Sequence, residues 1–158
     1  MKISREELQA ACFRYAGSVV PDPTSILRLE WEPVVPSGFV VYLMIVAGDV
    51  KKAGKAEDTG SSTFRKRMQS EFATLRQVIR GPHPGRQPAG WRSRPLDPFK
   101  QYAPAAILNG SIVELWAKAC PTRESMLDEE INLNRRYRGE WTKEGRGKDG
   151  PRCATVVD

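Results

Sequence analysis

The sequence has few cysteines and a single histidine, and both shortages exclude classes of site. Cys12, Cys120 and Cys153 lie far apart and form no CxxC pair, so the sequence predicts neither a disulfide framework nor a zinc site. With His83 as the one histidine, neither a histidine-based triad nor a multi-histidine metal centre is expected. This cysteine usage is typical of a reducing compartment, and we expect the cytoplasm.

Long apolar runs and nucleotide-binding loops are also missing. The longest uncharged apolar run extends from Phe39 to Gly48, far short of the ~20 residues that a membrane-spanning helix needs. The first residues include Lys, Arg and two Glu, which predicts no secretory signal. Neither GxxxxGKS/T nor GxGxxG occurs. We therefore expect no membrane partner and no nucleotide cofactor.

Positive charge is concentrated in the middle third of the chain. The formal charge is +6, but residues 51–100 hold twelve Lys and Arg against four Asp and Glu, so this segment is +8 and the remainder is −2. A basic segment on a near-neutral body is typical of a protein that binds polyanions. A solvated basic face without a partner explains the charge equally well.

The first part of the chain predicts a helix, a connection and a β-hairpin. A capping-box pattern predicts a short amphipathic helix over residues 5–16, and four prolines predict an irregular connection over residues 17–37. An apolar strand over residues 39–47 is expected to turn at Gly48 and pair with residues 49–53.

A helix and a long loop are predicted next. Apolar residues recur at helical spacing from Phe64 until Gly81 ends the pattern. Residues 81–104 hold six prolines and three glycines, which predicts a loop of a length that is usually functional or disordered.

The last part predicts a second hairpin and a final helix. Asn109-Gly110 lies between two apolar segments and indicates a type I′ turn, and the final helix is expected to end near Tyr137. The predicted order is helix, strand, strand, helix, strand, strand, helix. This order indicates a small α/β fold of the α+β kind, with a central antiparallel sheet flanked by helices.

Glu130 is the most informative acidic residue. On a helical projection it falls within the apolar stripe formed by Met126, Leu133 and Tyr137. A carboxylate in that place costs several kcal/mol unless it is paired with a cation or bound to a metal. A core salt bridge to an arginine and a metal site both remain open.

Three further residues have ordinary explanations from composition. Tyr42 lies in an apolar strand, where a core tyrosine with a satisfied hydroxyl is usual. Arg65 and Arg67 flank the apolar stripe of the middle helix on opposite sides and are described adequately as solvated helix arginines.

Four segments, taken together and in order, resemble the motifs of the GIY-YIG nuclease family. VVY (40–42) stands where the family has Gly-Ile-Tyr, and KAG (52–54), followed by Lys-Ala, stands where it has Tyr-Ile-Gly. FRKRM (64–68) is similar to the helix that bears the family's arginine, and EINLNRRYR (130–138) is similar to its glutamate helix. The resemblance covers about residues 38–72 and 105–142.

The sequence departs from the family at three places. Lys52 replaces the second tyrosine, as in a branch of the family's restriction enzymes. About five extra residues (59–63) precede the arginine helix. The asparagine that usually follows the glutamate helix has no clear match, and Thr142 stands roughly in its place.

The resemblance implies hydrolysis of a DNA phosphodiester with Mg²⁺ or Mn²⁺. Tyr42 would orient or deprotonate the water, and Lys52 would favour the phenolate. Arg67 would hold the scissile phosphate, and Glu130 would bind the metal. The 81–104 loop would recognise DNA, or only pack across the sheet. The residues expected to contact DNA are Lys55, Arg65, Arg86, Trp91, Arg92 and Arg94.

These expectations describe a single GIY-YIG-like nuclease domain over residues 1–158. Its parts are an N-terminal helix and connection (1–37), a catalytic core (38–142) that carries the insertion loop 81–104, and a flexible tail (143–158). The leading hypothesis is a sequence-specific type II restriction-like endonuclease, which would act as a homodimer if it cuts duplex DNA. The alternatives are a nicking, structure-specific or single-strand nuclease, and a non-catalytic nucleic-acid-binding module.

Overall fold

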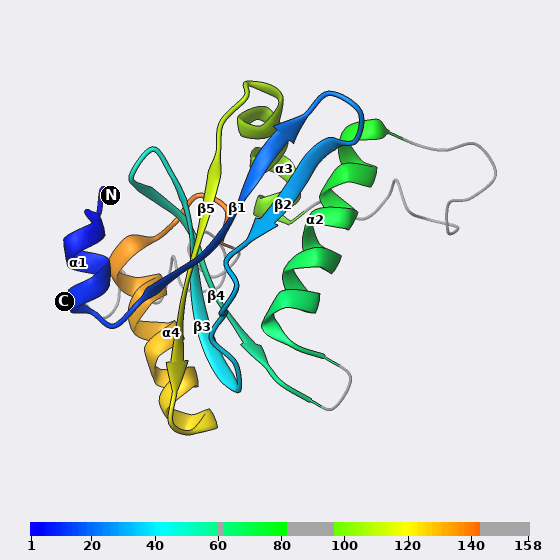
Figure 1. Cartoon of the computed structure of the whole chain (residues 1–158). Helices are drawn as coiled ribbons and strands as arrows, with labels where there is room; N and C mark the ends of the chain where they lie inside the picture. Colours follow the sequence, from blue (N-terminus) through cyan, green and yellow to red (C-terminus); the bar gives the residue numbers. More distant parts are fainter. Residues whose placement is uncertain (60–61, 82–96, 143–158) are drawn as a thin grey trace.

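The computed structural model describes residues 1–59, 62–81 and 97–142, and it contains one antiparallel sheet between two layers of helices (Figure 1). The five strands lie in the order β2-β1-β5-β3-β4, and every neighbouring pair is antiparallel. The predicted α+β class is therefore confirmed. The elements are α1 (Arg5–Ala10), β1 (Arg14–Asp22), β2 (Ile26–Trp31), β3 (Phe39–Val46), β4 (Asp49–Glu57), α2 (Phe64–Arg80), α3 (Pro98–Leu108), β5 (Val113–Cys120) and α4 (Arg123–Tyr137).

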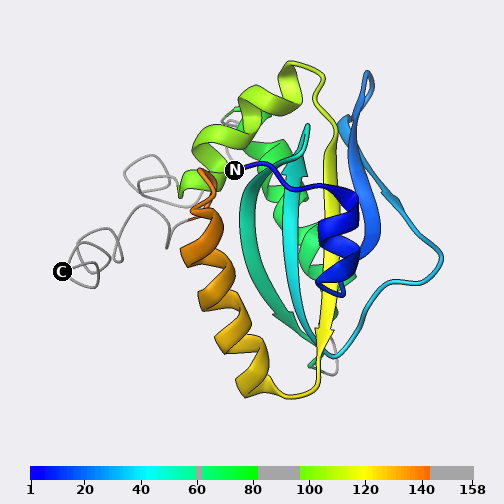
Figure 2. The same cartoon turned by 90° about the vertical axis from the view of Figure 1, so that its left-hand side faces the viewer.

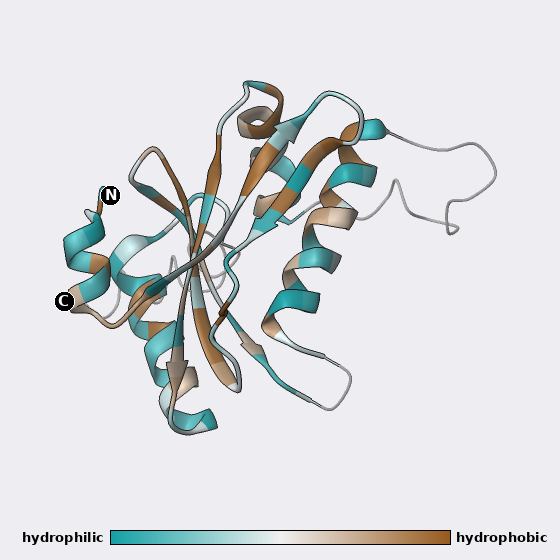
Figure 3. Cartoon of the chain, viewed as in Figure 1, coloured by the Kyte–Doolittle hydropathy of each residue, from teal (hydrophilic) through white to brown (hydrophobic). Residues whose placement is uncertain are grey.

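Each face of the sheet carries its own apolar cluster. Helices α2 and α3 cover one face, and α1 and α4 cover the other (Figure 2). Strand β3 serves both clusters, because Tyr42 and Met44 face α2 while Val41 and Leu43 face α4. Burial on both faces explains why this strand is a continuous apolar run rather than an alternating one. Figure 3 shows hydrophobic colour along much of the strands and hydrophilic colour on much of the helices.

The β3–β4 hairpin confirms the prediction for this part of the chain and extends it. Ala47 and Gly48 form the turn, with φ values of 49° and 82°, and two left-handed residues match the right-handed twist of a hairpin. Strand β4 continues to Glu57, four residues beyond the predicted end at Ala53.

The predictions for residues 5–37 were partly wrong. Helix α1 ends at Ala10, and residues 17–37 hold most of β1 and all of β2 instead of an irregular connection. The prolines do not prevent this hairpin because they lie where few ladder hydrogen bonds are needed. Pro21 is beyond the last β1–β5 pair at Val19, so it has a strand neighbour on one side only.

The hairpin predicted at Asn109-Gly110 is a helix end instead. Helix α3 begins after Asp97, whose side chain accepts a hydrogen bond from the Lys100 N–H, and it ends at Leu108, with Asn109 as its C-cap. Gly110 follows with a φ of 80°. Asn-Gly favours left-handed backbone after a helix as well as in a hairpin, so the pattern alone did not separate the two. The helix also replaces the last residues of the loop predicted over 81–104.

Helices α2 and α4 confirm their predictions. Thr63 caps α2 through the Lys66 N–H, Gly81 follows its end with a φ of 78°, and Thr122 caps α4. The buried stripe of α4 includes Tyr137, and burial raises the pKa of its phenol. Within the described residues, no helix is long and apolar enough to cross a membrane.

Polar contacts from elsewhere in the chain cover parts of both sheet edges. At β2, the Arg76 guanidinium donates to the carbonyl oxygens of Ser25 and Leu27 at 2.8 and 2.9 Å. At β4, residues 139–142 form what we call the edge strap. Its backbone N–H at Trp141 donates to the Lys51 carbonyl at 2.8 Å.

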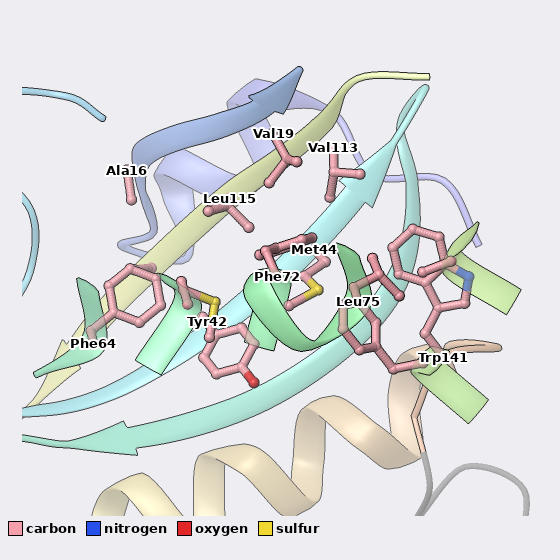
Figure 4. Close-up of a cluster of buried hydrophobic side chains, with 14 of the residues drawn as sticks. Ala16, Val19, Tyr42, Met44, Phe64, Phe72, Leu75, Val113, Leu115 and Trp141 are labelled. Atoms are coloured by element: carbon pink, nitrogen blue, oxygen red, sulfur yellow. The ribbon is translucent and has the colours of Figure 1, made fainter. Parts of the chain in front are cut away.

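The edge strap joins the two helix layers. It leaves α4 on one face of the sheet, whereas the Trp141 ring belongs to the apolar cluster of the opposite face and lies 5.8 Å from the Phe99 ring centroid (Figure 4). Gly139 is required at the crossing, because a Cβ there would collide with the Lys51 carbonyl. The Lys51 ammonium pairs with Glu140 at 3.2 Å.

Candidate functional site

Strand β4 is the end strand of the sheet, and it carries two of the predicted site residues, Lys52 and Lys55, together with Gly54 of the KAG segment. Gly54 pairs with Tyr42 of β3, and Lys52 lies two residues earlier on the same face, toward α2. Lys55 pairs with Val41 and therefore lies on the α4 face. Because β4 has a strand neighbour on one side only, side chains from both faces can meet at its free edge.

Tyr42 lies across β4 only because residue 54 is glycine. The tyrosine is 1% exposed, and its ring packs against Phe64 with centroids 5.6 Å apart. A Cβ at position 54 would lie 2.5 Å from both Cζ and Oη of Tyr42. The hydroxyl sits at the margin of the apolar cluster, on the side of β4 (Figure 4). Lys52 pairs with Met44, so it lies on the same face as Tyr42 but two residue positions along β4 from the Tyr42–Gly54 pair.

Substitution of Gly54 by alanine is expected to lower the free energy of unfolding by about 1–3 kcal/mol, the usual cost of forcing extra atoms into a packed core. In a Tyr42→Leu background the same change should cost less, because Cζ and Oη are then gone. Urea denaturation of the four proteins measures this coupling. Gly110→Ala is the control, since position 110 has open space and only a strained φ of +80°. Equal costs in the two backgrounds would contradict the contact.

Lys52 and Arg67 meet at a pocket of about 290 Å³ on the α2 face. The Lys52 Nζ lies 3.0 Å from Oε2 of Glu71, and the Arg67 Nε lies 3.4 Å from Oε1 of the same carboxylate. The Lys52 ammonium also lies 4.7 Å above the Phe99 ring centroid. The pocket is lined by Lys52, Arg67, Ser70, Glu71, Thr74, Asp97, Phe99 and Lys100.

Glu71 was not predicted as a site residue. One signal was present, because Glu71 follows Arg67 by four residues on the same helix, a spacing at which side chains meet. Its second partner was not visible, because the contact with Lys52 joins a helix to a strand and depends on the packing between them.

Arg65 lies away from the pocket. Its guanidinium carbon is 5.3 Å from the centroid of the Trp31 ring, so it packs toward β2 rather than along β4. The expected separation of Arg65 and Arg67 on two sides of the helix is thus observed. The other residues expected to contact DNA in the 81–104 loop lie outside the described residues; they are Arg86, Trp91, Arg92 and Arg94.

Glu130 lies on the other face of the sheet and pairs with a lysine of β4. Its Oε2 is 2.9 Å from the Lys55 Nζ, and its side chain is 16% exposed. The partner is thus a lysine instead of the arginine considered from sequence. The neighbouring Glu129 turns the other way and pairs with Lys118 of β5 at 3.2 Å.

The donor set at Glu130 fits a magnesium ion better than a metal that needs several protein ligands. In the described part of the chain, no group of three or more His, Cys, Asp or Glu side chains could hold a metal. Mg²⁺ keeps several waters and is usually bound by one or two carboxylates together with substrate phosphates. A single carboxylate at the edge of the sheet is compatible with that mode of binding.

Thr142 has a structural contact in this arrangement. It is 1% exposed, and its Oγ1 accepts a hydrogen bond from the Ala53 N–H at 3.3 Å. Thr142 thus fixes the edge strap to β4.

No protein-family model matches the chain, and no curated protein matches its sequence. Among solved structures, a mutant of EndoII from bacteriophage T4 is similar with a TM-score of 0.54 and 15% identity, over 87% of this chain and 96% of that chain. The restriction endonuclease HPY188I in complex with product DNA gives a TM-score of 0.48 and 11% identity, over 86% of this chain and 82% of that chain. At such identity the likeness to EndoII shows the fold alone.

Proposed function

We propose that this protein is a metal-dependent endonuclease that hydrolyses phosphodiester bonds in DNA. The observation that carries the proposal is the edge of β4. Lys52 and Arg67 lie together on one face, Lys55 and Glu130 pair on the other, and Tyr42 reaches across Gly54 between them. Two cations, a phenol and a separate carboxylate are the groups that phosphodiester hydrolysis needs. The fold shared with EndoII agrees with the resemblance in sequence.

Each side chain has a defined task in this proposal. The Arg67 guanidinium binds the scissile phosphate through its planar donor fork, and the Lys52 ammonium adds a second positive charge to the same pocket. The Tyr42 hydroxyl orients the attacking water. A Mg²⁺ or Mn²⁺ held by Glu130 supplies charge stabilisation to the phosphate and to the leaving oxygen.

Lys55 has two tasks in this proposal. Its ammonium pairs with Glu130 in the free protein, which offsets the cost of a partly buried carboxylate. With Glu130 holding a metal, the Lys55 ammonium would be available for a neighbouring phosphate of the DNA backbone.

The finer proposal is a single nuclease domain that acts as a type II restriction-like enzyme. A duplex has two strands, and each copy of the chain supplies one site of this kind, so cleavage of both strands calls for a homodimer. A nicking or single-strand nuclease would use the same catalytic groups without that requirement.

Plasmid digestion tests the proposed function. Purified protein with Mg²⁺ should convert supercoiled plasmid into discrete linear fragments, and EDTA should stop the reaction. Sequencing the fragment ends would then give the recognition site. Nicked circles without linear fragments would replace the restriction-like reading by a nicking enzyme. Tight DNA binding without cleavage under any divalent metal would overturn the proposal in favour of a binding module.

A further inference from the structure

Glu71 contacts both cations of the pocket through different oxygen atoms. Its Oε2 lies 3.0 Å from the Lys52 Nζ, and its Oε1 lies 3.4 Å from the Arg67 Nε. The Lys52 and Glu71 side chains are only 17% and 18% exposed, whereas that of Arg67 is 54% exposed. The bridge is therefore sheltered at Lys52 and open to solvent at Arg67.

The bridge uses Arg67 in a particular way. The ion pair engages Nε, so it leaves the two terminal nitrogens, Nη1 and Nη2, outside this contact. Those two nitrogens form the edge of the fork that binds a phosphate with two parallel hydrogen bonds. A carboxylate on Nε therefore fixes the guanidinium plane without covering the edge that a phosphate would use.

Lys52 is fixed from two directions. The carboxylate of Glu71 lies on one side of the ammonium, and the Phe99 ring lies 4.7 Å away on another. A carboxylate and an aromatic face both attract a cation. Without Glu71, the ammonium and the guanidinium would repel each other across the same pocket wall.

The bridge also lowers the net positive charge of the pocket. Lys52 and Arg67 together carry two positive charges, and Glu71 offsets one of them. A polyanion gains affinity with each cation that it can neutralise, so Glu71 lowers the attraction of the pocket for DNA while it fixes the geometry of both cations.

We propose that Glu71 is a positioning residue that holds Lys52 and Arg67 in place for the scissile phosphate. By doing so it raises the rate of cleavage and lowers the affinity for DNA. This inference rests on the proposed nuclease function. It predicts that binding and cleavage change in opposite directions when the charge of Glu71 is removed, which loss of fold stability alone would not produce.

Glu71→Gln is the decisive variant because it preserves size and removes charge. In EDTA, this variant should bind a fluorescent duplex about threefold to tenfold more tightly than wild type, and its log K should fall more steeply with log salt by about 0.9, the value for one added phosphate contact. With Mg²⁺, its single-turnover cleavage rate should be roughly tenfold to hundredfold lower. Glu71→Asp keeps the charge and should keep the wild-type salt slope.

Glu114→Gln is the matched control. Glu114 is 24% exposed and pairs with Arg5 at 2.9 Å on the opposite face of the sheet, so its loss removes a comparable ion pair far from the pocket. Neither binding nor cleavage should change. Binding and cleavage that fall together in Glu71→Gln, or a steep salt slope in Glu71→Asp, would overturn the inference.

A measurement without DNA separates this inference from the proposed function. The Lys52 ammonium should give a resolved ¹H–¹⁵N signal in the wild type, because its ion pair slows exchange with water, and the signal should disappear in Glu71→Gln. A signal that is unaffected by the substitution overturns the positioning role. A wild-type protein that shows the signal but cuts no DNA overturns the proposed function instead.

Discussion

Glu130→Gln is expected to lower the rate of DNA cleavage by about 10³-fold or more while DNA binding is retained. The glutamine keeps the shape of the side chain but offers no charged oxygen to a metal. Loss of the carboxylate also frees the Lys55 ammonium, which lies 2.9 Å from it. DNA binding in EDTA should therefore stay equal or become slightly tighter.

Glu129→Gln is the control for this prediction. Glu129 is the neighbour of Glu130 on the same helix and has the same side chain. The substitution removes an ion pair of similar length, 3.2 Å to Lys118. Because Glu129 faces β5 instead of the β4 edge, cleavage should stay within about threefold of wild type. Single-turnover cleavage at saturating protein measures both variants. A Glu130→Gln protein that cuts DNA at the wild-type rate would show that Glu130 does not bind the catalytic metal.

Arg67→Ala is expected to lower cleavage by about 10²- to 10³-fold, the usual loss when a group that stabilises the transition-state charge is removed. Arg65→Ala is its matched control from the same helix turn. The Arg65 guanidinium packs on Trp31, 5.3 Å from the ring centroid, and it does not line the pocket. Its removal should cost a few tenths of a kcal/mol to about 1 kcal/mol of stability and leave cleavage nearly unchanged.

Kinetics at several DNA concentrations distinguish binding from chemistry in these two variants. Loss of a contact made mainly in the transition state lowers kcat, whereas loss of uniform binding raises KM. We expect Arg67→Ala to act chiefly on kcat. Equal losses in Arg65→Ala and Arg67→Ala would mean that neither arginine is specific to the scissile phosphate.

Helix caps, apolar stripes and apolar runs in the sequence predicted the helices and strands whose formation depends on neighbouring residues. Helices α2 and α4 have caps and apolar stripes of their own, and β3 is apolar enough to be recognised as a strand. The strands around Pro21 were missed because proline breaks a sheet only where its missing N–H is needed, and that depends on which strands are neighbours. The hairpin predicted at Asn109-Gly110 was wrong for a related reason, since Asn-Gly favours left-handed backbone both in a hairpin turn and after the end of a helix.

The candidate site was predictable to the extent that its residues match motifs. Placement on the elements was correct for Tyr42, Lys52, Arg67 and Glu130, whose roles remain proposals. The contacts were not predictable, because they depend on the packing of two helices against opposite faces of one strand. The contact of Glu71 with Arg67 has i,i+4 spacing, but neither its contact with Lys52 nor the Lys55–Glu130 pair follows from spacing along the chain.

The edge strap has a consequence for how copies of this protein can associate. A β-strand at the end of a sheet is open to pairing with a strand of another molecule. Here the strap binds the carbonyl of Lys51 and the N–H of Ala53, and at the opposite edge Arg76 binds the carbonyl of Leu27 in β2 and that of Ser25 just before it. In the described part of the chain, neither edge offers a full row of groups for a continuous intermolecular sheet. Edge-to-edge pairing of two copies is therefore restricted to short segments, and the proposed function would use one of these, the part of β4 around Gly54 and Lys55, for DNA.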